Sequence, residues 1–315
     1  MHDIICRPVT RVAVITNRMT FQTIKNFILD IVDLISQLIP PIFSSYRYTF
    51  SSSHLDEVTS YIDILTYNVA FSTAFHPMRA NKVIEAIAVS NADVLCLQET
   101  NEKWKALLLC KFRAEYPYFH FSHPTQHQAA SGCAFLSRHP LKDISVVNST
   151  EIVEGSVFPQ LVCTVEDTRL GYGVKIANLH LRPPLNLDGT AHLETARTTG
   201  QVRLAEVRNI VHAHHGLEIL AGDFNEQDGA HALSYLVDSM ATNGMRDAVA
   251  DYVPSHKETH RWPFFFGTTL HKRLDHIVYQ TLKLKCVGCG VIPGFESGAS
   301  DHQPVLARFA PGRVR

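Results

Sequence analysis

From Tyr61 onward, short runs of apolar residues alternate with segments in which apolar residues recur at helical spacing. The short runs resemble buried strands: residues 62–71 read IDILTYNVAF, 93–100 read DVLCLQET and 217–225 read LEILAGDFN. The helix-like segments include residues 79–92, RANKVIEAIAVSNA, and 198–214, TTGQVRLAEVRNIVHAH. Many strands with a few interleaved helices predict an α/β or α+β fold.

The N-terminal part of the chain has a different pattern. Apolar residues recur at helical spacing over residues 21–39, Pro40 and Pro41 then stop the helix, and a serine-rich stretch follows. We therefore predict an extension over residues 1–56, made of an amphipathic helix at about 21–39 and a linker, and one domain over residues 57–315. The helix is expected to cap the domain or to pair with another chain. Membrane contact through residues 21–39 is the less favoured alternative, because the segment is charged and net acidic.

Composition excludes some classes of protein and partner. The chain is 45% hydrophobic and 19% charged, as expected for a globular protein with a sizeable core. Its 29 Lys and Arg nearly balance 30 Asp and Glu, so any contact with nucleic acid or phospholipid must be local. No feature of the sequence indicates an obligate protein partner.

The seven cysteines are odd in number and scattered, which predicts reduced thiols and an intracellular protein, cytoplasmic or nuclear. Cys286 and Cys289 have CxxC spacing, but no second pair exists for a zinc site and the segment is strand-like. We therefore expect no metal or redox role for this pair.

Several apolar runs end in polar residues that can bind a metal ion or a phosphate. Each of them alone is most simply a turn residue. Together they are an inventory that a sheet could bring to one edge: Asn68, Glu99, His180, Asp223, Asn225, Asp275, Asp301 and His302. Carboxylate and amide oxygens without thiolates suit a hard cation such as Mg²⁺. Such a site could hydrolyse a phosphate ester.

The motifs LTYN, LQET, LSRHPL, NLHL, AGDFN, RLDHIVY and SDHQPV occur in this order between about Ile64 and Val305. This ordered set resembles the endonuclease/exonuclease/phosphatase superfamily, whose members include pancreatic-type deoxyribonucleases, inositol polyphosphate 5-phosphatases and neutral sphingomyelinases. The resemblance implies a four-layer sandwich, in which two mostly antiparallel β-sheets are flanked by helices. It also implies an active site at the edge where strand ends converge.

The resemblance further implies a role for each motif residue. Glu99 would be the principal metal ligand, assisted by Asn68 and Asp301, with Mg²⁺ or alternatively Mn²⁺ as the cofactor. Asp223 would orient and deprotonate the attacking water. The remaining roles are phosphate contact and support: Asn225 would hold the phosphate and align Asp223, His180 and His302 would contact phosphate oxygens, and Asp275 would fix the tautomer of His302.

Other residues have two interpretations each. Arg182 follows His180 by two positions, so it is either a second phosphate contact or a surface arginine at a strand end. The aromatic stretch HRWPFFFG at residues 260–267 could stack on a base, face a lipid or belong to the core. Residues 101–113 surround Trp104 with basic residues, which indicates either a substrate contact or a solvated helix face.

The sequence thus predicts Mg²⁺-dependent hydrolysis of a phosphate ester, foremost a phosphodiesterase or nuclease activity. The presence of His180 in the motif NLHLRPP argues against a nuclease that repairs abasic sites in DNA. The alternative is a phosphatase or phospholipase C-type enzyme that acts on inositol phosphates or sphingolipid. An inactive binding module is less favoured, because every motif residue is present.

Overall fold

The computed structural model describes Tyr48, Phe50 and residues 60–124, 128–167, 169–185, 193–239, 245–254, 257–263, 269–296 and 298–312. The helix expected at residues 21–39, most of its linker and the domain boundary near residue 56 lie outside the described residues, whereas Tyr48 and Phe50 of the predicted linker pack against the hydrophobic core of the domain. None of the helices in these described ranges is long and apolar enough to span a membrane.

Six strands form the first sheet, in the order β13-β14-β1-β2-β4-β3. Only β1 and β2 pair in parallel, and every other neighbouring pair is antiparallel. The bounds of the strands are Ile62–Asn68 for β1, Val94–Gln98 for β2, Tyr118–Phe121 for β3, Cys133–Ser137 for β4, Leu284–Val291 for β13 and Val305–Pro311 for β14.

The second sheet also has six strands, in the order β5-β6-β7-β8-β12-β9. Here β7 and β8 form the single parallel pair. The bounds are Leu141–Val147 for β5, Gln160–Asp167 for β6, Tyr172–His180 for β7, Ile219–Asp223 for β8, Met245–Asp247 for β9 and Asp275–Gln280 for β12. A separate hairpin pairs β10, His260–Pro263, with β11, Thr269–Lys272.

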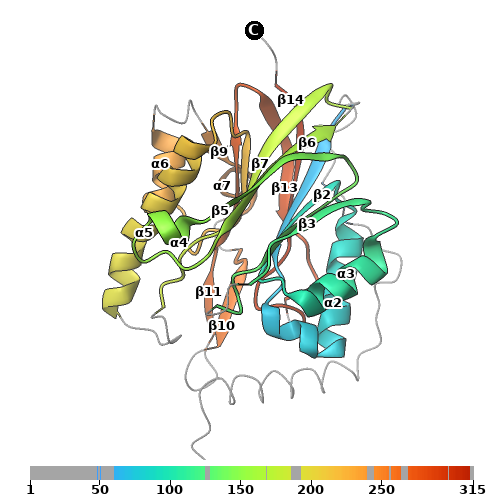
Figure 1. The fold of residues 1–315 in the computed structure, drawn as a ribbon, viewed down its shortest axis with the longest axis horizontal. Helices are drawn as coiled ribbons and strands as arrows, with labels where there is room; N and C mark the ends of the chain where they lie inside the picture. Colours follow the sequence, from blue (N-terminus) through green and yellow to red (C-terminus); the bar gives the residue numbers. More distant parts are fainter. Residues whose placement is uncertain are drawn as a thin grey trace, which may run out of the picture. The chain divides into compact units, whose positions relative to one another are not determined.

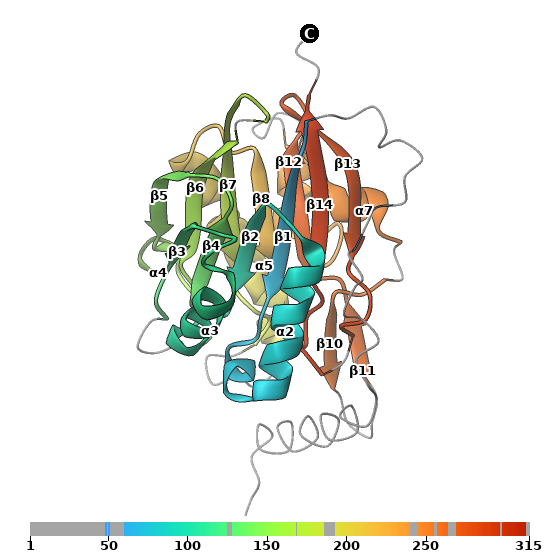
Figure 2. The ribbon, with the colours of Figure 1, turned by 90° about the vertical axis from the view of Figure 1, so that its right-hand side faces the viewer.

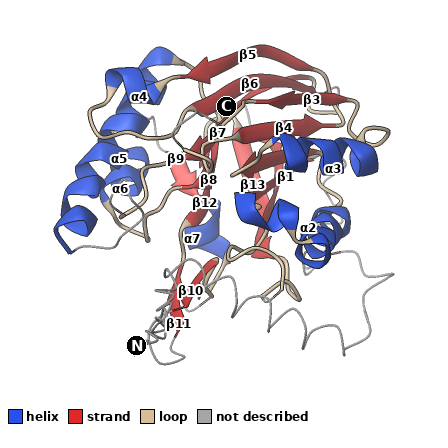
Figure 3. Ribbon diagram, turned by 60° about the horizontal axis from the view of Figure 1, so that its bottom comes forward, coloured by secondary structure: helices blue, strands red, loops and turns tan. Residues whose placement is uncertain are grey.

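Helices cover the outer face of each sheet, so the domain has four layers (Figures 1 and 3). The first sheet is covered by α2, Pro77–Ser90, and α3, Glu102–Phe112, with the short 3₁₀ helix η1, Phe71–Phe75, beside them. The second is covered by α5, Leu193–Ala213, and α6, His231–Asp238. Two short helices, α4 (Ser149–Ile152) and α7 (Ala248–Tyr252), complete the described elements. The predicted four-layer sandwich of two mostly antiparallel sheets is confirmed.

Each sheet is covered on both faces, and successive side chains of a strand pack on opposite sides of it. In β1, Ile62 and Ile64 face the core between the two sheets, whereas Leu65 and Tyr67 pack with α2 and α3. Successive residues of a strand point to opposite faces, so a strand covered on both sides reads as a continuous apolar run. Figure 2 shows β1 between β2 and β14 within the first sheet.

Two buried amides join the sheets at the end where the site lies. The Gln98 side chain donates from Nε2 to Oδ1 of Asn178 at 2.7 Å. The Asn178 Nδ2 donates in turn to the carbonyl oxygens of Leu97 and Ala134 at 3.1 and 2.9 Å. These bonds fix the end of β2, which Glu99 follows directly, against the end of β7, where His180 lies.

Six cysteines fall within the described ranges, and none of these six is in a disulfide. Five are buried and only Cys110 is exposed. Burial raises the pKa of Cys286 to about 12, so its thiol stays protonated. Cys286 and Cys289 lie in β13 and pack in the core between the sheets, as the strand-like pattern of the segment predicted.

Candidate active site

Three predicted residues lie side by side at the ends of neighbouring strands. In the second sheet, Asp223 at the end of β8 is in register with His180 on β7 and with Asp275 on β12. Residues in register on adjacent strands point to the same side of the sheet. The glycine before Asp223 allows this close packing, because a Cβ on Gly222 would lie 2.0 Å from the Leu179 carbonyl oxygen.

The Oδ2 atom of Asp223 is the point on which the site converges. Asn68 Nδ2 donates to it at 3.1 Å, and the Nε2 atoms of His302 and His180 lie 3.4 and 3.6 Å away. The other oxygen, Oδ1, accepts a hydrogen bond from the backbone N–H of Asn225 at 2.8 Å. Burial and then the nearby Asp275 raise the pKa of Asp223 to about 7, although His302 opposes the shift. Asp223 can therefore take up or release a proton near neutral pH.

The predicted pairing of Asp275 with His302 is present. His302 Nδ1 lies 2.8 Å from Asp275 Oδ2, and both side chains are buried. Burial lowers the pKa of His302, but the carboxylates of Asp275 and Asp223 outweigh it and raise the pKa to about 10. The ring is thus held as an imidazolium, with Nε2 directed into the site.

Glu99 and Asp301 form the acidic side of the site. Glu99 has a φ of 57°, which is unusual for a residue other than glycine, and its Oε2 accepts from the backbone N–H of Phe71 at 3.1 Å. Burial raises the pKa of Glu99, and the negative charge of Asp301 raises it further. A divalent cation between these two carboxylates would remove their repulsion, so the residues fit a metal ion.

Asn68 connects the acidic side to Asp223. Its Nδ2 donates to Glu99 Oε1 at 3.2 Å as well as to Asp223, whereas its Oδ1 accepts from the backbone N–H of Ala70 at 3.0 Å. The amide nitrogen therefore faces the carboxylates, and Asn68 orients both of them. Its predicted contact with a metal ion stays a prediction.

Two groups of described residues have three potential ligand atoms within 4.8 Å of one another, namely Asp223, Asp275 and His302, and Asp228, Asp247 and His276. In the second group both nitrogens of His276 already have partners, because Nδ1 lies 2.7 Å from Asp247 and Nε2 lies 3.1 Å from the Glu226 carbonyl oxygen. We therefore interpret Asp247 and His276 as a buried structural ion pair, whereas the exposed Asp228 pairs with Arg273.

His180 is held as a neutral ring. It stacks on Phe158, with ring centroids 4.1 Å apart, and only 2% of its surface is exposed. Burial, assisted by repulsion from His302, lowers its pKa to about 3. Unlike His302, it can therefore contact a phosphate only as an uncharged imidazole at neutral pH.

Arg182 and Asn225 lie next to these residues. Arg182 is 7% exposed, which excludes a surface arginine, and its guanidinium has no hydrogen bond to any described residue. Burial lowers its pKa. Asn225 has a φ of 50° and its Nδ2 donates to the Leu181 carbonyl oxygen at 2.9 Å. It aligns Asp223 through its backbone N–H.

A short polar run after a strand predicts a solvated loop for residues 226–228; this is correct for the exposed Gln227 and Asp228 and wrong for Glu226. Glu226 is 3% exposed, and its carboxylate accepts from Arg203 Nε and from the Ala232 backbone N–H, both at 2.8 Å. Arg203 also donates to the Arg182 carbonyl oxygen at 2.9 Å. Helix α5 thus anchors both strand ends of the site, through a pair that is 23 residues apart in sequence and gives no local signal.

The two tryptophans differ in their positions. Trp104 is fully buried, and its ring N–H donates to the Ala70 carbonyl oxygen at 3.3 Å, so its ring belongs to the core; a substrate contact by the basic residues of 101–113 stays a prediction. Its neighbours Glu102 and Lys103 are exposed, as a solvated helix face requires. Trp262 is half-buried on β10, and residues 264–267 of the aromatic stretch lie outside the described residues.

Comparison with known proteins identifies the class that this fold and site define. The family described as "Endonuclease/Exonuclease/phosphatase family" matches residues 65–302, most of the chain, and the protein belongs to this family. Members of the family are hydrolases that act on phosphate esters. No curated protein sequence matches the chain.

Solved structures with the same fold share little sequence with the chain. The human Nocturnin catalytic domain with bound sulfate is 20% identical with a TM-score of 0.59, and the match covers 81% of this chain and 95% of that one. The 2′,3′-cyclic phosphatase ANGEL2, in complex with adenosine-2′,3′-vanadate, is 16% identical with a TM-score of 0.59 and coverages of 79% and 95%. TDP2 from D. rerio, complexed with a single-strand DNA product, is 16% identical with a TM-score of 0.56 and coverages of 79% and 99%.

Proposed function

We propose that the protein is a Mg²⁺-dependent phosphodiesterase of nuclease type. The observation that carries this proposal is the convergence of Asn68, His302 and His180 on one carboxylate oxygen of Asp223, with Glu99 and Asp301 beside them. Phosphate-ester hydrolysis requires a base for the attacking water and hydrogen-bond donors for the phosphate oxygens. The site offers a carboxylate whose pKa is near neutrality as the base, with one charged and one neutral histidine beside it.

Glu99 and Asp301 would hold the cation, and Mn²⁺ is the alternative to Mg²⁺. When bound, the cation supplies positive charge to the phosphate oxygens and to the leaving oxygen. The remaining chemistry belongs to the side chains of this chain.

Asp223 accepts the proton of the attacking water at Oδ2. The Asn68 amide and the Asn225 backbone N–H hold the carboxylate in place while this occurs. His302 donates a charged hydrogen bond from Nε2 to a phosphate oxygen, and Asp275 stabilises its positive charge from the Nδ1 side. His180 and Arg182 contact further phosphate oxygens, so negative charge that develops in the transition state is met on several sides.

The substrate class of the proposal rests on the phosphate-binding groups and on the related structures. TDP2 is complexed with a DNA product and ANGEL2 acts as a 2′,3′-cyclic phosphatase, which favours nucleotide esters for this chain. A phosphatase or phospholipase C-type activity on inositol phosphates or sphingolipid is the alternative. The buried, reduced thiols support the further proposal of an intracellular location, cytoplasmic or nuclear.

A generic diester tests the activity without a choice of natural substrate. The purified chain is expected to hydrolyse bis-p-nitrophenyl phosphate with Mg²⁺, and EDTA is expected to abolish the reaction until Mg²⁺ is restored. Hydrolysis that is unchanged by EDTA would contradict the metal dependence. A panel of natural substrates extends the test: single- and double-stranded nucleic acids, phosphotyrosyl-linked DNA, inositol phosphates and sphingomyelin. If the chain hydrolyses none of them, the proposed function is wrong.

A further inference from the structure

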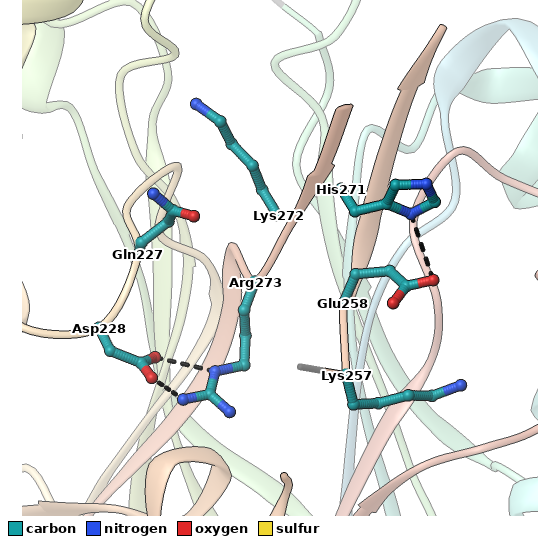
Figure 4. Close-up of a pocket in the computed structure, with 7 residues that line it drawn as sticks. All are labelled: Gln227, Asp228, Lys257, Glu258, His271, Lys272 and Arg273. Carbon is teal, nitrogen blue, oxygen red and sulfur yellow. Dashed lines mark hydrogen bonds and ion pairs between the residues drawn. The ribbon is translucent and has the colours of Figure 1, made fainter. Parts of the chain in front are cut away.

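A cavity of about 420 Å³ lies between the loop that follows β8 and the base of the β10–β11 hairpin. Cavities of this size accept a group about as large as a nucleotide. Its lining includes Gln227 and Asp228 from the loop, Lys257 and Glu258 before β10, and Lys272 and Arg273 at the end of β11 (Figure 4). We call this cavity the Lys272 pocket.

The Lys272 pocket lies close to the catalytic carboxylates along the chain. Gln227 follows Asp223 by four residues, and Arg273 precedes Asp275 by two residues. Two residues of extended chain span at most about 7 Å. The intervening segment is fixed, because Thr259 Oγ1 accepts hydrogen bonds from the backbone N–H groups of Leu274 and Asp275 at 3.0 and 3.1 Å.

Most charged groups of the pocket have a partner. Arg273 Nε donates to Asp228 Oδ1 at 2.9 Å, and Lys257 Nζ lies 3.5 Å from Glu296. Glu258 likewise pairs with Arg261 and with His271. These pairs fix the walls of the pocket and neutralise each other.

Lys272 is different. Its ammonium group has no hydrogen bond or ion pair with any residue that the structure describes, and Figure 4 shows the side chain extended on the same side of the pocket as Gln227. The pocket therefore has one cation in excess, beside an amide that can donate a further hydrogen bond. This is the chemistry that recognises an anionic oxygen group.

We infer that the Lys272 pocket is a subsite for a second phosphate group of the substrate, which Lys272 and Gln227 bind while the scissile phosphate lies at Asp223. The inference rests on the proposed function and narrows the range of its substrates. The preferred substrate carries at least two phosphates, as oligonucleotides and inositol polyphosphates do. A diester with one phosphate cannot use the subsite.

Binding measured without turnover tests the subsite separately from catalysis. In EDTA, a fluorescein-labelled single-stranded tetranucleotide is titrated against wild-type protein and Lys272→Ala at several salt concentrations. The variant is expected to bind about 5- to 10-fold more weakly. The slope of log K against log salt should fall in magnitude by about 0.7, the value for one lost phosphate contact on a single strand. Lys285→Ala, which removes an exposed lysine on β13, is the matched control and should bind like wild type.

Two further ligands identify what the pocket recognises. A labelled dinucleoside monophosphate, which has one phosphate, should bind Lys272→Ala and wild type equally. Inositol hexakisphosphate is then added as a competitor of the labelled tetranucleotide. If it displaces the tetranucleotide from wild type but not from Lys272→Ala, the second phosphate belongs to an inositol polyphosphate. If it displaces the tetranucleotide from neither protein, the second phosphate belongs to a polynucleotide.

Equal tetranucleotide affinities for wild type and Lys272→Ala, or no binding by wild type, would overturn the subsite. Failure of the proposed function looks different. In that case the chain hydrolyses no phosphate ester with Mg²⁺, although tetranucleotide binding still depends on Lys272.

Discussion

At the scale of single residues, the state of His302 depends on one neighbour. The carboxylate of Asp275 lies 2.8 Å from Nδ1 and is the largest of the contributions that raise the pKa of His302 to about 10. A residue whose folded pKa is raised keeps its proton below that pKa and loses it above. His302 should therefore remain a charged donor through neutral pH, and its deprotonation should reduce activity only at alkaline pH.

We predict that Asp275→Asn moves this alkaline decline to lower pH and reduces kcat by about 10²-fold. The asparagine can still hydrogen-bond to the ring, but it cannot stabilise its positive charge. The measurement is kcat for bis-p-nitrophenyl phosphate as a function of pH. Asp247→Asn is the control, because Asp247 forms an equally buried pair with His276 outside the catalytic group. An alkaline limb that stays in place in Asp275→Asn would show that the pair does not set the protonation of His302.

At the scale of the elements, helix α5 holds two strand ends by buried charge. Arg203 pairs with Glu226, and Glu206 accepts the backbone N–H of Arg182 at 3.0 Å. Burial raises the pKa of Glu206 from 4.5 to about 7 despite the hydrogen bonds and the two arginines that oppose the shift. The folded state thus binds the Glu206 proton more tightly than the unfolded chain does.

The sign of the resulting pH dependence follows from this shift. Stability from protonated Glu206 is fully present below about pH 4.5 and is lost as the pH rises to about 7. Glu206→Gln lacks this titrating group, so it should not lose this stability as the pH rises. We predict that its free energy of unfolding minus that of wild type increases by up to about 3 kcal/mol between pH 4.5 and pH 8. Urea unfolding at both pH values measures it, with the exposed Glu154→Gln as the control. A constant difference would mean that Glu206 is ionised in the fold at both pH values.

At the scale of the whole domain, the two sheets are joined by the amides of Gln98 and Asn178. Asn178→Leu would leave the carbonyl oxygens of Leu97 and Ala134 without this donor inside the core, whereas the Gln98 amide would keep Thr66 and Cys96 as acceptors. Each such group costs about 1–3 kcal/mol. We predict a loss of about 3–5 kcal/mol in the free energy of unfolding and reduced activity, because Glu99 follows Gln98 directly.

Urea denaturation and the rate of diester hydrolysis test this prediction. Asn148→Leu, at an exposed position, should change the free energy of unfolding by less than about 0.5 kcal/mol. If Asn178→Leu unfolds like wild type, the amides do not hold the sheets together.

Features that depend on a local sequence pattern could be predicted from the sequence, and features that depend on packing could not. Strand ends such as those at Asn68 and Asp223 were predictable, because an apolar run that stops at a polar residue is a local pattern. The pairing of Asp275 with His302 came from the ordered motifs, not from any local signal. The anchoring of Glu226 by Arg203 was not predictable, because it depends on how α5 packs on the second sheet. A short polar run after a strand otherwise predicts a solvated turn.

The central claim is that Asp223 is the base of a phosphate-ester hydrolase, and Asp223→Asn tests it most directly. Asparagine retains the size of the side chain, and its oxygen can still accept the hydrogen bond from the Asn225 N–H. The amide nitrogen that takes the place of Oδ2 can accept neither the Asn68 hydrogen bond nor the proton of the attacking water. We predict that kcat for bis-p-nitrophenyl phosphate with Mg²⁺ falls by about 10³-fold or more, while the urea midpoint stays near or above that of wild type. Asp238→Asn, at an exposed position on α6, should have wild-type activity. Full hydrolysis by folded Asp223→Asn would contradict the account.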